Sequence, residues 1–139
     1  MREVLIKNEE DTRVFGHQLA ENLKADSVVA LIGDLGTGKT TLTKYIAEGL
    51  GVKETITSPT FTIVSEYHSG RLPLYHFDVY RIEDADDLFE IGAEEYFYAG
   101  GVSIVEWADQ VAEILPDDTL CIFIEYGQRE GERIYKCTF

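Results

Sequence analysis

One segment of the chain has the residue types and the spacing of a phosphate-binding loop. Residues 33–40 read GDLGTGKT and match the pattern GxxxxGK(S/T) at every fixed position. In such a loop the glycines allow a tight turn, so that successive backbone N–H groups face the phosphate oxygens of a nucleotide. Lys39 brings a positive charge to the β- and γ-phosphates, and the hydroxyl of Thr40 is a suitable ligand for Mg²⁺. The residues that we expect to contact a nucleotide here are Leu35, Gly36, Thr37, Gly38, Lys39, Thr40 and Thr41.

The segments on either side of this loop are those that a phosphate site requires. Ser27–Ile32 is a continuous apolar run, as expected for a strand that is covered on both faces. Lys39–Leu50 is typical of a helix that is closed by glycines, and the partial positive charge of its N-terminal end points at the loop. The alternative is a glycine-rich turn between a strand and a helix that binds nothing. The complete motif in this context favours phosphate binding.

Two carboxylates are candidates for the rest of such a site. Glu106 directly follows a short apolar strand candidate, and an acidic group at that position beside a phosphate loop often holds Mg²⁺. Asp78 lies in the segment YHFDVYR, where alternation places it on one strand face with His76 and Tyr80. There it could position the attacking water or hold Mg²⁺ through a water. For each of the two carboxylates the alternative is a solvated charge at the end of a strand or a structural ion pair with Arg81.

Two further features near these residues are less specific. The hydroxyl-rich segment Thr57–Phe61 lies between the helix and the next expected strand, and it resembles a loop that senses a γ-phosphate. An ordinary turn into a strand explains the segment equally well. Trp107 follows Glu106, and we expect it to pack in the core rather than to stack on a nucleotide base.

The loop itself does not identify the nucleotide or the reaction. A GTPase of the Ras type would carry the guanine-reading tetrapeptide Asn-Lys-x-Asp, which does not occur in the sequence. A small-molecule kinase usually needs an arginine-bearing lid, and the arginines that follow the loop are few: Arg71, Arg81, Arg129 and Arg133. ATP is therefore the favoured ligand and hydrolysis the favoured reaction, with transfer to a metabolite as the main alternative.

The composition of the chain limits its partners. The 12 lysines and arginines stand against 26 acidic residues, which gives a formal net charge of −14. Affinity for nucleic acids depends on cationic groups that displace phosphate counterions, so we expect no DNA binding and no direct tRNA-binding face. No apolar run approaches the roughly 20 residues that cross a bilayer, and the first residues lack the apolar stretch of a signal peptide. We therefore expect a soluble, cytoplasmic protein with no membrane partner.

The length and the order of elements predict one P-loop domain over residues 1–139. At 139 residues and 15.7 kDa the chain has the size of a typical domain. Besides the two elements that flank the loop, we expect strands at 2–7, 61–67, 72–80, 102–105, 119–126 and 133–139, and helices at 9–24 and 85–97, the second broken near Gly92. This order predicts an α/β fold, a P-loop NTPase-like three-layer sandwich with a mixed, mostly parallel central sheet and antiparallel edge strands. Cys121 and Cys137 fall in expected strands, so we expect buried thiols, with a disulfide as the alternative.

Several motifs, taken in order, resemble one protein family. GDLGTGKTT at 33–41, SPTF at 58–61, HFDVYR at 76–81 and VEW at 105–107 look like the bacterial TsaE family. The resemblance covers nearly the whole chain. It implies an ATPase that needs Mg²⁺, turns over slowly, and takes part in making N6-threonylcarbamoyladenosine at position 37 of tRNAs that read ANN codons.

The same resemblance implies roles for individual residues. Thr40 and Glu106 match the positions that hold Mg²⁺, and Asp78 matches an essential acidic position near the γ-phosphate. The expected catalytic residues are therefore Lys39 and Asp78. The family also has base contacts near the start of its first helix, which correspond to Glu9 and Thr12 here.

The resemblance also implies partner proteins. The ATPase would act with a TsaD-like transferase subunit and its TsaB-like paralogue, would reset or regulate their complex, and would meet tRNA only indirectly. Two alternatives stay open at this point. One is a stand-alone small-molecule or nucleotide kinase, and the other is an interaction module that needs bound ATP and for which hydrolysis is incidental.

Overall fold

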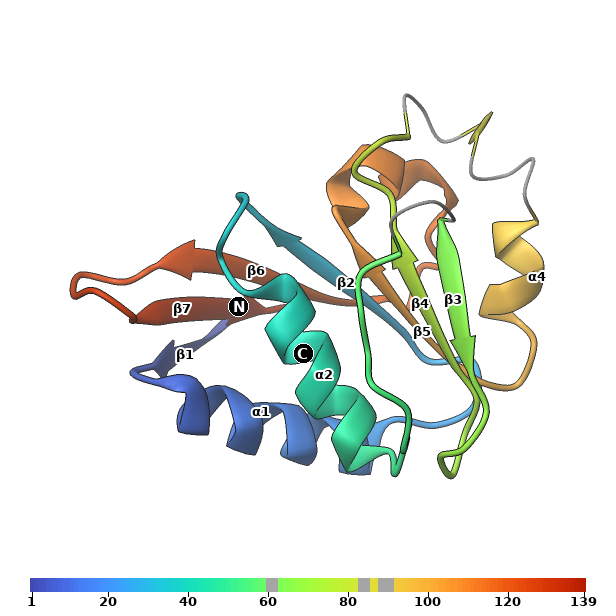
Figure 1. Cartoon of the computed structure of the whole chain (residues 1–139). Helices are drawn as coiled ribbons and strands as arrows, with labels where there is room; N and C mark the ends of the chain where they lie inside the picture. Colours follow the sequence, from blue (N-terminus) through green and yellow to red (C-terminus); the bar gives the residue numbers. More distant parts are fainter. Residues whose placement is uncertain (60–62, 83–85, 88–91) are drawn as a thin grey trace.

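The computed structural model describes residues 1–59, 63–82, 86–87 and 92–139. The elements in these ranges are β1 (Arg2–Ile6), α1 (Glu9–Asn22), β2 (Val28–Gly33), α2 (Lys39–Gly49), β3 (Val64–Tyr67), β4 (Leu74–Asp78), α4 (Ala93–Phe97), β5 (Val102–Glu106), a kinked 3₁₀ helix (Ala108–Ile114), β6 (Leu120–Tyr126) and β7 (Arg133–Cys137) (Figure 1). The expected elements are confirmed with shifted ends, except that most of the helix expected before Gly92 lies outside the described residues. No helix in these ranges is long and apolar enough to cross a membrane.

A seven-stranded sheet forms the middle layer, in the order β1-β7-β6-β2-β5-β4-β3. The four central strands are parallel, because β2 pairs in parallel with β5 and β6, and β5 pairs in parallel with β4. The outer pairings are antiparallel: β7 with β1 and β6, and β3 with β4. The predicted mixed sheet with a mostly parallel centre and antiparallel edges is thereby confirmed.

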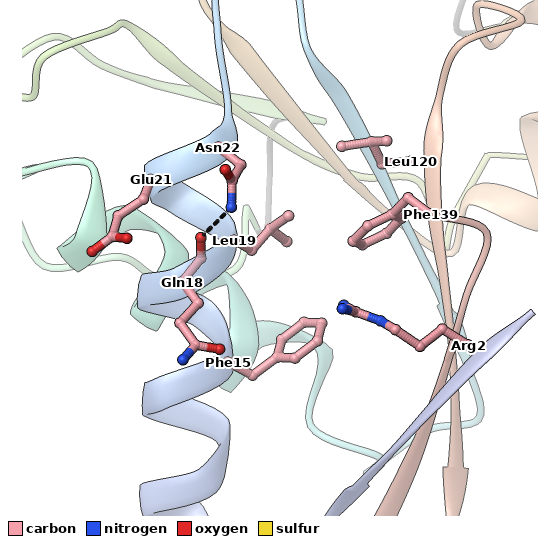
Figure 2. Close-up of a pocket in the computed structure, with 8 residues that line it drawn as sticks. All are labelled: Arg2, Phe15, Gln18, Leu19, Glu21, Asn22, Leu120 and Phe139. Atoms are coloured by element: carbon pink, nitrogen blue, oxygen red, sulfur yellow. Dashed lines mark hydrogen bonds between the residues drawn. The ribbon is translucent and has the colours of Figure 1, made fainter.

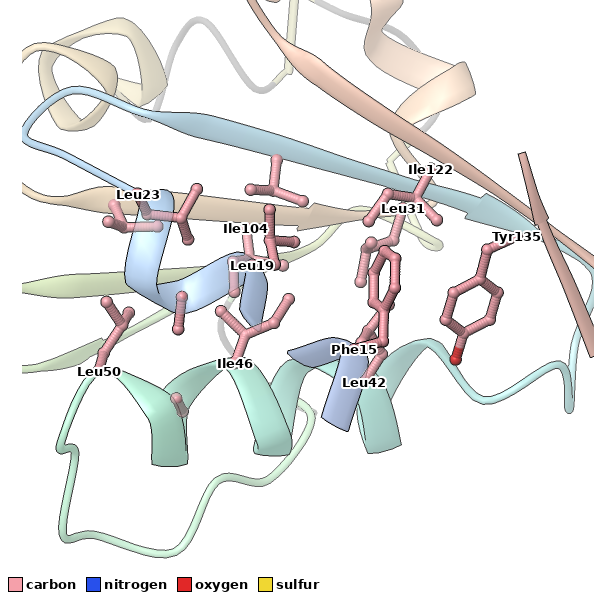
Figure 3. Close-up of a cluster of buried hydrophobic side chains, with 14 of the residues drawn as sticks. Phe15, Leu19, Leu23, Leu31, Leu42, Ile46, Leu50, Ile104, Ile122 and Tyr135 are labelled. Atoms are coloured by element: carbon pink, nitrogen blue, oxygen red, sulfur yellow. The ribbon is translucent and has the colours of Figure 1, made fainter. Parts of the chain in front are cut away.

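Helices cover both faces of this sheet, which gives the three layers (Figure 1). In β2, Val29 and Leu31 contribute to the apolar cluster that α1 and α2 cover, whereas Val28 and Ala30 contribute to the cluster beneath α4 and the 3₁₀ helix. Both faces of β2 are therefore buried, which explains why its sequence is apolar at successive positions. Figure 3 shows the first cluster, in which Phe15 of α1 lies near Tyr135 of β7.

The start of α1 is fixed by a capping contact. The side chain of Asn8 accepts a hydrogen bond from the backbone N–H of Asp11 at 3.0 Å, so Asn8 is the N-cap of this helix. At the other end, the guanidinium of Arg71 donates to the carbonyl of Leu23 at 2.8 Å. This bond ties the turn between β3 and β4 to the end of α1.

The two cysteines lie in neighbouring strands and are free thiols. Cys137 is fully buried and Cys121 is half-buried, and burial raises the pKa of both thiols. The expectation of reduced, buried cysteines is confirmed for Cys137 and in part for Cys121. The disulfide alternative is wrong.

Candidate functional site

Three parallel strands end beside the phosphate loop. The loop follows β2 directly, and the register of β4 and β5 places their last residues, Asp78 and Glu106, opposite each other. A cavity of about 350 Å³ lies at this edge, and its walls are Leu35, Gly36, Gly38, Lys39, Thr40, Thr41, Ser58, Asp78, Glu106 and Trp107. The structure therefore brings together the loop and both carboxylates that the sequence singled out.

The loop itself turns through conformations that favour glycine. Gly36 has φ of 83° and Gly38 has φ of 99°, both in the left-handed region where a side chain would be strained. Between them, Thr37 closes the turn, since its N–H and its hydroxyl donate to the carbonyl of Asp34 at 3.2 and 2.8 Å. The spacing of the glycines thus follows from the geometry of the turn.

Lys39 is buried at the base of the loop, with only 5% of its surface exposed. Its amine donates to the carbonyls of Gly33 at 2.7 Å and Asp34 at 3.0 Å, and it lies 3.8 Å from the centroid of the Trp107 ring. Burial lowers the pKa of Lys39, and nearby carboxylates, with Glu106 first among them, oppose that shift. A positive charge is therefore held next to the cavity, with few solvent contacts to weaken it.

Thr40 and Glu106, which line the same cavity, form a cluster of oxygen atoms. The Thr40 hydroxyl lies 2.9 and 3.1 Å from the two carboxylate oxygens of Glu106, and 2.9 Å from the hydroxyl of Ser58. Hydroxyl and carboxylate oxygens are the ligands that Mg²⁺ prefers, and this ion usually also takes waters and substrate phosphates. The donor set therefore fits Mg²⁺ with a nucleotide bound beside it.

His76 completes this cluster, and it has a role that the sequence did not predict. Its Nε2 lies 2.5 Å from Oε2 of Glu106, and both side chains are almost entirely buried. Nδ1 finds no hydrogen-bond partner in the described part of the chain, so the imidazole makes its one polar contact with Glu106. The signal in the sequence was the alternation of His76 with Asp78, but the contact depends on β4 lying next to β5.

Asp78 lines the same cavity, but its hydrogen bond and its pKa differ from those of the residues above. Its Oδ1 accepts a hydrogen bond from the N–H of Tyr80 at 3.1 Å. No ion pair joins Asp78 to Arg81 among the residues that the structure describes. Burial raises the pKa of the Asp78 carboxyl, and the charge of Glu106 adds to the effect, whereas Lys39 works against it. A carboxylate with a raised pKa is a better proton acceptor near neutral pH.

The two less specific features, Trp107 and the segment Thr57–Phe61, have different places in the structure. Trp107 is half-buried against the apolar cluster near α4, its ring lies 4.7 Å from that of Tyr80, and it covers the amine of Lys39. Of the segment Thr57–Phe61, Ser58 reaches Thr40, Thr57 is exposed, and the residues from position 60 lie outside the described ranges. Among the described residues of that segment, Ser58 is therefore the one that lines the cavity.

A second, smaller cavity lies at the start of α1. It measures about 220 Å³, and its lining residues are Ile6, Asn8, Glu9, Thr12, Thr37, Gly38, Thr41, Gly131, Arg133 and Tyr135. Glu9 and Thr12 are thus near the phosphate loop, where the resemblance placed base contacts. The sequence did not indicate Arg133 or Tyr135, which reach this cavity from β7.

A third cavity, of about 510 Å³, lies between α1 and the strands at the end of the sheet (Figure 2). Its walls combine apolar side chains such as Phe15 and Phe139 with polar and charged ones, which are Arg2, Gln18, Glu21 and Asn22. No residue of the phosphate loop lines it. Its size exceeds that of the other two, but it lacks converging groups that could do chemistry, so the candidate site is the loop.

Comparisons with known proteins agree with the motifs. The family model described as "Threonylcarbamoyl adenosine biosynthesis protein TsaE" matches residues 6–134. The tRNA threonylcarbamoyladenosine biosynthesis protein TsaE of Bacillus subtilis is 47% identical over 132 residues, which is 95% of this chain and 80% of the relative. The protein of that name from Treponema pallidum is 46% identical over 127 residues, which is 89% of this chain and 93% of the relative. The crystal structure of Bacillus subtilis YdiB is similar with a TM-score of 0.83 and 41% identity, over 96% of this chain and 82% of that one. The chain belongs to the TsaE family.

Proposed function

We propose that this protein is an ATPase that uses Mg²⁺ and takes part in making N6-threonylcarbamoyladenosine at position 37 of tRNAs. The observation that carries the proposal is the single cavity in which a complete phosphate loop meets Lys39, Thr40, Asp78 and Glu106. Membership in the TsaE family and the names of the relatives support the pathway. The site supports the chemistry.

Each group at the cavity has a part in holding the triphosphate. The backbone N–H groups of the loop and the N-terminal end of α2 would bind phosphate oxygens, and Lys39 would neutralise charge on the β- and γ-phosphates. Thr40 and Glu106 would hold Mg²⁺, which lowers the charge on the phosphates when it is bound. His76 keeps the Glu106 carboxylate in one orientation through its Nε2 contact.

Asp78 is the residue that we assign to the hydrolytic step. A water beside Asp78 would attack the γ-phosphorus, the bond to the β–γ bridging oxygen would break, and ADP and phosphate would leave. The Asp78 carboxylate would orient that water and accept its proton, and the pKa raised by burial suits this role. Lys39 would stabilise the charge that gathers on the phosphate oxygens.

The smaller cavity would hold the nucleoside end of ATP. It shares Gly38 and Thr41 with the larger cavity, so a nucleotide could run from one cavity to the other. Glu9 and Thr12 offer a carboxylate and a hydroxyl to the base or the ribose. We therefore assign base binding to the first turns of α1.

The charge of the chain supports an indirect relation to tRNA. With a net charge of −14, this domain would be repelled by phosphate-rich RNA, so a partner would have to hold the tRNA. We propose TsaD-like and TsaB-like proteins in the cytoplasm as those partners, which ATP turnover here would reset or regulate. An acidic surface of this domain would dock on a basic face of their complex.

Product analysis with γ-labelled ATP tests the proposal. The label should appear as inorganic phosphate, slowly for the protein alone and faster when the partner proteins are added. Label on a metabolite or nucleotide would favour the kinase alternative instead. Turnover that stays flat while a complex still assembles with ATP would favour the interaction module.

A further inference from the structure

The outer side of the phosphate loop is held by the hairpin of β6 and β7. The hydroxyl of Tyr126, the last residue of β6, donates to the carbonyl of Leu35 at 3.0 Å. Arg133, the first residue of β7, donates from Nε to the carbonyl of Thr37 at 3.0 Å and from Nη2 to that of Gly36 at 3.3 Å. Two side chains from one hairpin thus hold three successive carbonyls of the loop.

The two side chains also support each other. The guanidinium carbon of Arg133 lies 4.6 Å from the centroid of the Tyr126 ring, within the range of a cation–π contact. The third nitrogen, Nη1, donates to the carbonyl of Glu132 at 2.9 Å. Every nitrogen of the guanidinium therefore donates to a backbone carbonyl, which leaves Arg133 in contact with the loop rather than aimed at a phosphate.

These bonds determine which way the amides of the loop point. In a trans peptide the C=O of one residue and the N–H of the next point in opposite directions. Because the carbonyls of Leu35 and Thr37 face the hairpin, the N–H groups of Gly36 and Gly38 are turned away from it. Both glycines line the cavity that also contains Lys39 and Thr40. The hairpin contacts thus set the loop amides toward the place where phosphates would lie.

We propose that Arg133 and Tyr126 are positioning residues for nucleotide binding, which they favour by holding the loop in its binding conformation before the nucleotide arrives. This inference rests on the proposed function and extends it to a second element of the fold. A flexible loop must be ordered when a ligand binds, and a loop that is already ordered avoids that loss of entropy. The planar guanidinium of Arg133 reaches the neighbouring carbonyls of Gly36 and Thr37 through two nitrogens in a fixed geometry, which the single ammonium group of a lysine at position 133 does not reproduce.

Matched variants separate this role from a direct effect of charge. Arg133→Lys keeps the positive charge and loses the planar guanidinium, and Tyr126→Phe keeps the ring and loses the hydroxyl. We expect affinity for ATP, measured by calorimetry, to fall about tenfold in Arg133→Lys and about threefold in Tyr126→Phe. Lys136→Gln is the control, because Lys136 lies on the same strand and pairs with Glu125 at 3.1 Å without touching the loop. Its affinity should equal that of the wild type.

A second measurement does not depend on nucleotide. In the nucleotide-free protein, we expect NMR order parameters at the Gly36 and Gly38 amides to fall from about 0.85 toward 0.6 in Arg133→Lys, while those of α2 stay constant. Unchanged affinity and unchanged order in both variants would overturn the inference. A wild type that binds no ATP, with lower order parameters of the loop in the variants, would instead overturn the proposed function, and the contacts of Arg133 and Tyr126 would then stabilise the loop only as a part of the fold.

Discussion

The two ends of the phosphate loop are held in different ways. The end that enters α2 carries Lys39 and Thr40, and it faces charged side chains at the ends of parallel strands, with Glu106 among the contacts. The tip, Leu35–Thr37, is held through backbone carbonyls by Tyr126 and Arg133, which come from an antiparallel hairpin. The first end would do the chemistry, and the second would keep the loop in shape.

This difference predicts two kinds of variant. A change at the α2 end removes a charge, a metal ligand or a proton acceptor, so it should alter a rate or an affinity by a large factor. A change at the tip removes hydrogen bonds to backbone carbonyls, so it should alter order and affinity by a smaller factor.

Lys39→Ala should give the largest loss. The cavity would lose its buried positive charge while Asp78 and Glu106 stay, so ATP would meet two carboxylates without a countercharge. We expect affinity for ATP to fall on the order of 10³-fold, the scale of removing one partner from a desolvated charge pair. Calorimetric titration measures this loss, and Lys44→Ala, an exposed lysine on the same helix, is the control. A loss no larger than that of Arg133→Lys would break the comparison between the two ends.

Asp78→Asn should leave binding intact and slow the reaction. The amide keeps the shape of the side chain and cannot accept a proton from water. We expect the single-turnover rate of hydrolysis to fall about 10²–10³-fold, with ATP affinity within about twofold of the wild type.

Asp109→Asn tests whether net charge alone explains such a loss. Asp109 is exposed, contributes negative charge near Lys39, and does not line the cavity. Its hydrolysis rate should stay near that of the wild type. Equal rates in all three proteins would remove Asp78 from the mechanism.

His76→Leu tests whether the Glu106 carboxylate depends on its neighbour. Without the Nε2 contact the carboxylate keeps only its contacts with the Thr40 hydroxyl among the described residues, so we expect the Mg²⁺ concentration that half-saturates nucleotide binding to rise about 10- to 100-fold. His76→Gln places a donor near the same position and should restore part of the loss. His68→Gln is the control, because His68 is exposed and contacts Glu66 at 3.3 Å instead. An unchanged Mg²⁺ requirement in His76→Leu would make the histidine a packing residue only.

The α2 end could be predicted from the sequence because its residues follow local rules. The loop motif fixes Lys39 and Thr40 by spacing, and a carboxylate after an apolar strand marks Glu106. Asp78 could be predicted from the alternation of side chains along its own strand. The fold class followed in the same way, from strands that alternate with helices.

The tip could not be predicted, because its contacts depend on the order of strands in the sheet. Arg133 lies 96 positions from Thr37, and the two meet only because β6 lies beside β2 and β7 beside β6. The pairing of His76 with Glu106 depends likewise on β4 lying beside β5. The spacing of residues along the chain predicts neither of these strand neighbours.

The smallest expected effect is on the stability of the protein. It has opposite signs for a variant of Asp78, which lies near the α2 end of the loop, and for a variant of Arg133, which contacts the tip. Without nucleotide, the ionised Asp78 is disfavoured by burial and by Glu106, so its pKa lies above the usual 3.8. Wild-type stability therefore falls as pH rises from 3.8 through the raised pKa, and Asp78→Asn should avoid that loss.

Asp78→Asn should thus be more stable than the wild type at pH 7, by about 0.5 kcal/mol, and the gain should vanish below pH 3.8. Arg133→Lys should instead be less stable by a similar amount, since it loses contacts and relieves no charge. Urea unfolding of the nucleotide-free proteins at several pH values measures both differences. If both variants shift the free energy of unfolding in the same direction at pH 7, the ionised Asp78 does not destabilise the fold. The contacts at the two ends of the loop would then not differ in their electrostatic effect on stability.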